Sequence, residues 1–269
     1  MIDTHVHFTY ISKKSKELEE VFKRANKEGI YYFVDIGLHP DDINERMYIL
    51  SNAEKVFFTA GYYPDYANEN SDDTINAFEL KIKNLNESSR LGKKSIYAVG
   101  EIGLDYYHNS ENKDEQKEFF FDLCNVAKRL DLPIIIHSRD AFADTFSVLK
   151  KASLLKTGIF HCFSGGVEEA KKALDLGYIL SFSGATTYLK NSFIRDAVKY
   201  VPDDMFTIET DSPYLSPQRV RGRSNEPAFI TYTAELIAEL KNESKEEIMF
   251  KALENANRVL DLNINLLLH

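Results

Sequence analysis

The stretch MIDTHVHFTYISKKSKELEEVFKRANKEGIYYFVDI, residues 1–36, contains the pattern that decides the fold. A run of β-branched and apolar residues lies at 2–7, and a second lies at 30–36. Between the two runs, the apolar residues of 18–25 recur at the spacing of one helix face. Gly29 follows this helical pattern, where a left-handed cap suits glycine. The stretch therefore predicts two parallel strands joined by a helix.

The rest of the chain repeats this unit. The predicted strands are 2–7, 30–36, 56–61, 96–101, 133–137, 158–161, 178–182 and 206–210. Regular alternation of strands and helices indicates a parallel sheet, and eight such units indicate a closed barrel. We therefore predict an α/β fold, a (β/α)8 TIM barrel that forms a single domain over residues 1–269, with extra C-terminal helices closing it after Phe229. The competing fold, an open doubly wound sheet, would need a glycine-rich loop after the first strand, where none occurs.

Composition limits the class of protein further. With 269 residues, 43% of them hydrophobic, the chain can bury a large core without a protein partner, and disorder is not expected. Its 33 Lys and Arg against 42 Asp and Glu give a net charge of −9, which disfavours passive binding along nucleic acid. The two cysteines are too few for a disulfide framework, and the sequence has neither a membrane-length apolar run nor the form of a signal peptide. We expect a cytoplasmic protein that does not bind membranes.

Polar side chains gather at the C-terminal ends of the predicted strands, where barrel active sites lie. The metal-binding types among them are His5, His7, Glu101, His137, His161 and Asp211. His5 and His7 are two residues apart on one strand, so they share a face and can bind one ion together. Taken alone, a strand histidine is more often a hydrogen-bonded core residue. Six such donors at one end of a barrel favour a site for two divalent ions, with one carboxylate bridging them.

Several motifs resemble those of the TatD family of metal-dependent hydrolases, in the amidohydrolase superfamily. In chain order they are DTHVHF (3–8), AVGEIGLDYY (98–107), LPIIIHSRDA (132–141), IFHCFSGG (159–166), YILSFSGA (178–185), IETDSPYLSP (208–217) and RGRSNEP (221–227). The resemblance runs nearly from end to end. It implies the following ligand set: His5, His7 and Asp211 for one metal, His137 and His161 for the other, and Glu101 between both.

One position departs from the family pattern. After the third strand the family usually has Gly-x-His-Pro, but this chain has Tyr63 in place of the histidine. The string at 37–40 has the family's letters, but it follows the second strand, so we expect His39 to be a surface residue. We expect the same of His108 and His269. Tyr63 can donate a hydrogen bond, but with a pKa near 10 it is a poor base at neutral pH.

The ligand set indicates hydrolysis by a metal-activated water. The resemblance implies that Asp211 also orients this water and accepts its proton. For substrate binding we select Tyr63, Arg139 and Arg221, because guanidinium groups suit phosphate diesters, although arginines on an acidic protein also pair with carboxylates. Imidazole and carboxylate ligands suit zinc, manganese, nickel or iron, and magnesium where substrate phosphate completes the shell.

Tyrosines in the loops after the third and fourth predicted strands offer ring faces on which unpaired bases could stack. They are Tyr62, Tyr63, Tyr66, Tyr106 and Tyr107. Core packing explains most tyrosines equally well. The leading interpretation is a deoxyribonuclease that removes nucleotides from a single-stranded 3′ end, a direction that the resemblance implies.

Two other functions stay open. The first is a metal-dependent hydrolase of C–N bonds, lactones or aminoacyl esters, which the acidic charge and Tyr63 favour. The second is a catalytically idle barrel that serves as a scaffold. Six polar ligands argue against a scaffold, because a retired site has no physical need to keep them together.

Overall fold

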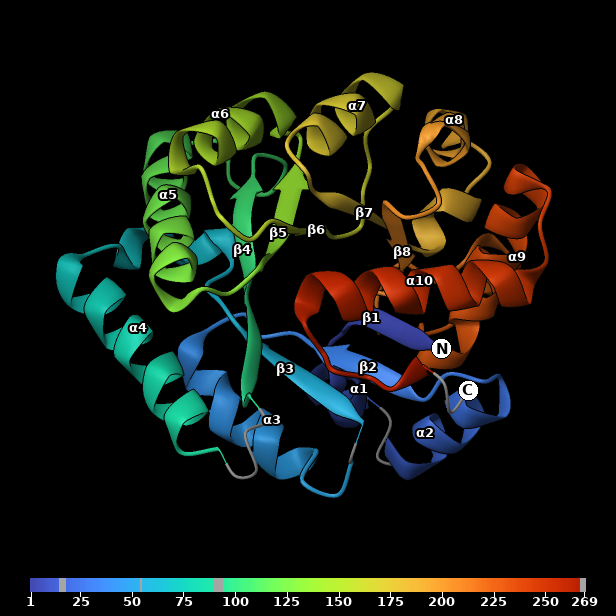
Figure 1. Ribbon diagram of the computed structural model, residues 1–269, viewed down its shortest axis with the longest axis horizontal. Coiled ribbons are helices and arrows are strands. Elements are labelled where there is room, and N and C mark those ends of the chain that lie inside the picture. Colours follow the sequence, from blue (N-terminus) through green and yellow to red (C-terminus); the bar gives the residue numbers. More distant parts are fainter. Residues whose placement is uncertain (15–17, 54, 90–93, 267–269) are drawn as a thin grey trace.

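The computed structural model (Figure 1) describes residues 1–14, 18–53, 55–89 and 94–266. Eight strands form one sheet in sequence order, and all neighbours are parallel. They are β1 (Ile2–Val6), β2 (Tyr32–Asp35), β3 (Val56–Ala60), β4 (Ile96–Asp105), β5 (Ile134–Arg139), β6 (Gly158–Phe160), β7 (Ile179–Phe182) and β8 (Phe206–Ile208). A parallel bridge between Val6 and Ser212 joins the end of β1 to the segment after β8. The predicted TIM barrel is confirmed.

The described part of the chain has ten α-helices, most of which surround the barrel on its outside (Figure 1). They are α1 (Phe8–Lys14), α2 (Leu18–Lys27), α3 (Ile43–Ile49), α4 (Asp72–Glu87), α5 (Lys113–Leu130), α6 (Phe142–Ala152), α7 (Val167–Asp175), α8 (Ser192–Tyr200), α9 (Ile230–Lys241) and α10 (Lys245–Leu260). Strand residues alternate between two cores. On β5, Ile134 and Ile136 pack in the layer beneath the helices, whereas Ile135 packs in the barrel interior. Because both faces of each strand are buried, the strands read as nearly continuous apolar runs.

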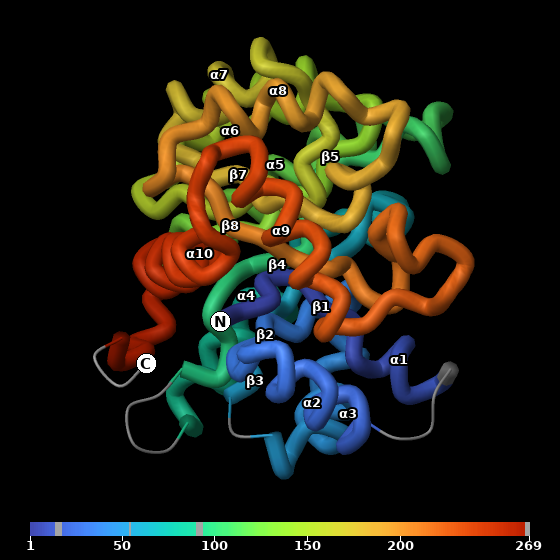
Figure 2. The backbone as a smooth tube through the Cα atoms, turned by 90° about the vertical axis from the view of Figure 1, so that its right-hand side faces the viewer, coloured from blue at the N-terminus to red at the C-terminus, as the bar shows by residue number. Residues whose placement is uncertain are grey.

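The last helix closes one end of the barrel, as expected. α10 lies against β1 and β8 in both views (Figure 1, Figure 2). Its Leu253, Ala256 and Leu260 pack with the interior core, which includes Ile2 and Ile135. This apolar plug leaves the other end of the barrel, where the strands finish, for a polar site.

Seven of the eight strands end one to four residues away from the predicted position, and two of these differences bear on the site. β4 continues four residues past Glu101 to Asp105, with a register shift against β5 between Val99 and Ile102. Glu101 is therefore inside a strand and not at its end. β8 ends at Ile208, so Glu209 begins the loop that leads to Asp211.

The structure also bears on membrane-spanning helices and on the two cysteines. Among the described residues, no helix combines the length and apolar character that crossing a membrane requires. Both cysteines are free, and Cys124 is buried in the layer beneath the helices.

Candidate metal centre

The six predicted ligands meet at the C-terminal end of the barrel. Their ligand atoms form two groups, and within each group all atoms lie within 4.8 Å of one another. The first group is His5, His7 and Asp211; the second is Glu101, His137 and His161. The residues come from β1, β4, β5 and the segments directly after β1, β6 and β8. The barrel therefore brings together residues that are up to about 200 positions apart in the sequence.

The first group is built across the seam between β1 and β8. The backbone N–H of Asp211 donates to the carbonyl of His5 at 2.9 Å, which holds the loop after β8 against β1. The Asp211 Oδ1 atom lies 3.4 Å from His7 Nε2 and 3.8 Å from His5 Nε2. One carboxylate oxygen and two imidazole nitrogens thus converge on one point.

Glu101 lies between the two groups. Its Oε1 atom is 2.6 Å from His137 Nδ1 and 2.9 Å from His161 Nε2, whereas its Oε2 atom is 3.4 Å from His5 Nε2. The two oxygens of one buried carboxylate therefore face different ligand groups. This is the arrangement that a bridging carboxylate requires.

Burial and mutual attraction shift the charges of the second group. Burial opposes ionisation of Glu101, but His161 and His137 outweigh it and hold its pKa well below the usual value. Burial likewise disfavours a charged His161, but the carboxylates of Glu101 and Glu209 raise its pKa well above the usual value. The centre strongly attracts positive charge, which is supplied by a proton or a cation.

Buried ring nitrogens supply an independent sign of a ligand. Both ring nitrogens of His5 and the Nδ1 atom of His7 are buried without a hydrogen-bond partner among the described residues. An unsatisfied buried polar atom costs about 1–3 kcal/mol. Among these atoms, His5 Nε2 faces the carboxylates of Glu101 and Asp211, so a divalent cation bound there would accept its lone pair and remove its share of this cost. The residues present therefore fit metal ions.

Two further carboxylates, which the sequence reasoning missed, hold the histidines of the second group. Asp105 Oδ2 lies 3.2 Å from His137 Nε2, and Glu209 Oε1 lies 3.2 Å from His161 Nδ1. Each carboxylate contacts the ring nitrogen opposite the one that faces Glu101, which fixes the ring orientation and increases its basicity. Both residues lie within motifs quoted above. The predicted strands, 96–101 and 206–210, placed Asp105 in a loop and Glu209 inside a strand, whereas Asp105 is the last residue of β4 and Glu209 is the first residue after β8.

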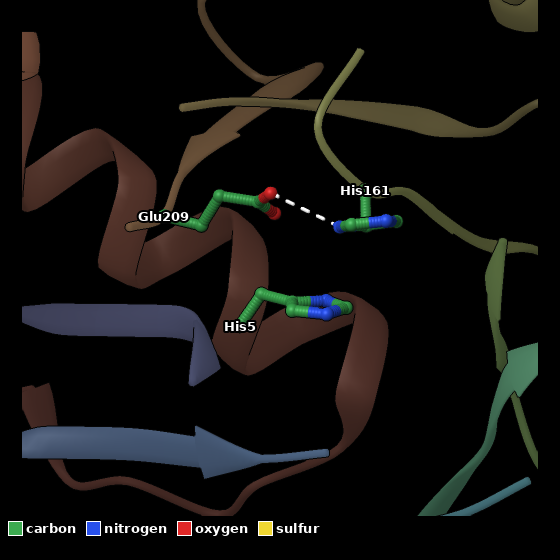
Figure 3. Close-up of side chains that lie close together, drawn as sticks. All are labelled: His5, His161 and Glu209. Atoms are coloured by element: carbon green, nitrogen blue, oxygen red, sulfur yellow. Dashed lines mark hydrogen bonds and ion pairs between the residues drawn. The ribbon is translucent and has the colours of Figure 1, made fainter. Parts of the chain in front are cut away.

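Figure 3 shows how Glu209, His161 and His5 lie relative to one another. Glu209 reaches His161 from the segment after β8, and the His5 ring stacks on the His161 ring with centroids 3.8 Å apart. Glu209 Oε1 also accepts the backbone N–H of Cys162 at 2.8 Å. These contacts tie β1, β6 and β8 together beneath the two ligand groups.

Asp105 is the more heavily bonded of the two carboxylates. Its Oδ2 atom also accepts from Tyr63 Oη at 2.9 Å and from His108 Nδ1 at 2.8 Å, and its Oδ1 atom accepts the backbone N–H groups of Tyr107 and His108. Although burial opposes it, His137 and His108 hold the pKa of Asp105 far below the usual value. The Tyr63 hydroxyl therefore donates its hydrogen bond to the ionised carboxylate of Asp105. Burial raises the pKa of Tyr63 far above the ordinary value. His108, expected only at the surface, is half exposed and joins this network.

Five of the six predicted ligands, all except His5, line a pocket of about 620 Å³. Of the residues selected for substrate binding, Tyr63 and Arg139 line this pocket and Arg221 does not. The Arg221 guanidinium lies 4.3 Å from the ring centroid of Tyr188, outside the pocket. His39 is also outside it, where it caps a short helical turn and lies 3.2 Å from Glu69.

The predicted tyrosine cluster is divided by the structure. Tyr63 and Tyr66 line the pocket, whereas Tyr62 is buried against Phe78 and Phe119, and Tyr106 donates to Asp144. The Tyr107 ring lies beneath the Arg139 guanidinium, with 4.0 Å to its centroid. Two tyrosines that the sequence reasoning did not select, Tyr10 and Tyr214, line the pocket as well.

Comparison with known proteins places the chain in a family. The family described as "TatD related DNase" matches residues 2–261. YabD of Bacillus subtilis strain 168, an uncharacterized metal-dependent hydrolase, is 36% identical over 264 residues, which cover 98% of this chain and 100% of YabD. YcfH of Escherichia coli K12, another uncharacterized metal-dependent hydrolase, is 32% identical over 267 residues, which cover 98% of this chain and 96% of YcfH. The crystal structure of YjjV, a TatD homologue from Escherichia coli K12, matches with a TM-score of 0.87 and 27% identity over 97% of this chain and 98% of YjjV. The chain therefore belongs to the TatD family of metal-dependent hydrolases.

Proposed function

We propose that this chain is a deoxyribonuclease that hydrolyses phosphodiester bonds with two divalent metal ions. The observation that carries the proposal is Glu101, whose two oxygens face two separate groups of imidazole and carboxylate ligands. Two adjacent metal ions are common in enzymes that cleave phosphate diesters. The description of the matching family as a DNase supports DNA as the substrate.

The six candidate ligands would form two metal-binding sites that share Glu101. His5, His7 and Asp211 would hold one ion, His137 and His161 would hold the other, and Glu101 would contact both. When bound, the ions would lower the pKa of a water and neutralise charge on the phosphate oxygens. The donor set suits zinc, manganese, nickel or iron, with magnesium favoured only if phosphate oxygens complete its shell.

Asp211 is suited to orient the attacking water and accept its proton. Its side chain lines the pocket and is 13% exposed, whereas the side chain of Glu101 is only 3% exposed. Although burial opposes it, His7 and His5 hold the pKa of Asp211 below the usual value, so a carboxylate is present at neutral pH. A carboxylate can accept a proton where a carboxylic acid cannot.

The pocket walls would hold the substrate. Arg139 is exposed on the rim and suits a phosphate, whereas Arg221 would contact only a longer strand outside the pocket. Tyr63 would contribute its ring to the wall, because its hydroxyl donates to Asp105. A pocket at a barrel mouth admits an unpaired chain end more readily than a continuous duplex, which favours a single-stranded end as the substrate. The choice of the 3′ end is what the resemblance to the TatD family implies.

The test is metal add-back with a labelled strand. Protein stripped of metal is supplied with manganese, magnesium, zinc, nickel or iron and incubated with 3′-labelled single-stranded DNA, and nucleotide release is measured. We expect release with at least one ion and none in Glu101→Ala. Failure of every ion to support release, together with cleavage of a lactone, amide or aminoacyl ester panel, would overturn the proposal in favour of the other hydrolase.

A further inference from the structure

One flank of the pocket is aromatic. Tyr10, from α1, and Tyr214, from the loop after β8, both approach the ring of His7. The ring centroids of Tyr10 and Tyr214 lie 5.9 Å and 6.1 Å from that of His7, and 6.3 Å from each other. Because His7 belongs to the first ligand group, any substrate group bound there passes within reach of the two tyrosine rings.

Both rings are partly exposed where they line the pocket, and the Lys13 Nζ atom lies 5.8 Å from the Tyr10 ring centroid. Tyr10 is 40% exposed and Tyr214 is 44% exposed, although aromatic rings usually gain stability by burial. Their planes are tilted by 54°, so they do not form a parallel slot. A flat group would stack on one ring and meet the other with its edge. Such a surface binds aromatic faces and does not read the hydrogen-bonding pattern of a base.

Other residues that line the pocket are polar or charged: Asp65, His108 and Arg139. Of these, His108 shares the Asp105 carboxylate with His137 of the second ligand group. The chain as a whole carries a net charge of −9, so long-range attraction does not supply affinity for a polyanion. Affinity for a nucleic acid must therefore come from local contacts: Arg139 suits the phosphate, and the aromatic flank offers ring stacking to a base.

We propose that Tyr10 and Tyr214 form a stacking subsite for an unpaired nucleobase next to the scissile phosphodiester. The inference rests on the proposed function and names its substrate class as strands with an unstacked terminal base. Every base has a stackable face, so the subsite accepts all four bases with similar affinity. A base inside a duplex already stacks on its neighbours and is excluded.

The experiment compares substrates with and without the base. The metal-reconstituted protein is assayed on a thymidine dinucleotide and on two analogues in which one or the other nucleoside is an abasic tetrahydrofuran. For the unsubstituted chain we expect kcat/KM to fall on the order of tenfold for one of the two analogues. In Tyr10→Leu/Tyr214→Leu this difference shrinks to about twofold, mainly through a higher KM for the dinucleotide.

Two controls isolate the ring from the fold. Tyr10→Phe/Tyr214→Phe keeps both rings and should keep the discrimination. Tyr48→Leu changes a tyrosine of α3 that is 82% exposed, and should behave like the unsubstituted chain. Equal loss on all three substrates in the leucine variant, or no loss at all, would overturn the stacking subsite while leaving the nuclease proposal intact.

A binding measurement separates the two proposals. Fluorescence anisotropy with a labelled single strand and its abasic counterpart needs no cleavage. If no phosphodiester is cleaved but base-dependent binding is lost in the leucine variant, the proposed function fails and the subsite stands. If the two strands bind equally, or neither binds, the subsite is refuted.

Discussion

Asp211 combines two tasks in one side chain. It belongs to the first ligand group, and it is also the carboxylate of that group that reaches the pocket. Asn keeps the shape and one oxygen but cannot accept a proton at neutral pH. In Asp211→Asn we expect hydrolysis to fall by about 10²- to 10⁴-fold while metal remains bound at the second group. Activity assays beside metal analysis check this, and full activity would exclude Asp211 as the proton acceptor.

Asp105 contacts the His137 ring but is not itself a member of either ligand group. It carries the contacts to Tyr63, His108 and His137 on one oxygen, so its charge and position orient the His137 ring. In Asp105→Asn we expect the affinity of the second group for metal to fall by about 10- to 100-fold. Competition with a chelator followed by titration measures it.

The matched control for this variant is Asp144→Asn. Asp144 also accepts a tyrosine hydroxyl, that of Tyr106, but it has no contact with the six ligands. Metal affinity should be unchanged in the control. Unchanged affinity in Asp105→Asn as well would mean that the His137 ring holds its orientation through packing alone.

The closing helix α10 stabilises the barrel from the end opposite the site. Leu253 is 2% exposed and packs in the interior core. Truncation of a buried leucine leaves a cavity, so Leu253→Ala should lower the free energy of unfolding by about 2–5 kcal/mol. Denaturant unfolding measures this change, with the exposed Glu254→Ala as the control. Loss of metal binding in the folded variant would show that α10 also supports the site.

A charged cluster joins α9 and α10 to the loop before β8. Asp203 lies 3.0 Å from Lys241 and 2.6 Å from Lys251, and these lysines lower its pKa from 3.8 to about 2. The ionised form is favoured by folding, so its stabilisation is present above about pH 4 and is lost as the pH falls towards 2.

Thermal unfolding of Asp203→Asn tests this linkage. The variant should be slightly less stable than the unsubstituted chain at pH 7, and the difference should shrink steadily between pH 4 and 2. The effect is small because the Asp203 side chain is 49% exposed and water screens the pair. A difference that is constant across this range would show that the carboxylate charge is not responsible.

Metal binding should stabilise the whole barrel, because the ligands come from both sides of its seam. An ion that binds only the folded chain at 100 times its Kd contributes about 2.7 kcal/mol. For a chain of this size that corresponds to a rise in Tm of roughly 5–10 °C. Calorimetry of stripped and reconstituted protein measures the rise. Glu101→Ala should lose most of it, and an equal rise in that variant would place the ions elsewhere.

The barrel and the meeting of the six candidate ligands at one end of it were predictable because strands and their ends follow from local patterns. Strand–helix alternation can be read within windows of about thirty residues, and His5 and His7 reveal a shared face by their spacing alone. The parallel barrel then brings all strand ends to one rim, which is why residues as distant as His5 and Asp211 could be assigned to one site.

The residues that surround the candidate ligands could not be predicted, because their positions depend on contacts between segments that are distant in the sequence. Glu209 and His161 are 48 positions apart, and Asp105 and His137 are 32 apart. Whether a carboxylate reaches a ring nitrogen depends on where the strand ends, and β4 runs four residues further than its apolar pattern indicates. Tyr10 and Tyr214 likewise meet only because β1 and β8 adjoin at the seam. Periodicity thus predicted the scaffold and the strand ends that carry the six candidate ligands, whereas barrel closure determined what surrounds them, because side-chain positions depend on packing between distant segments.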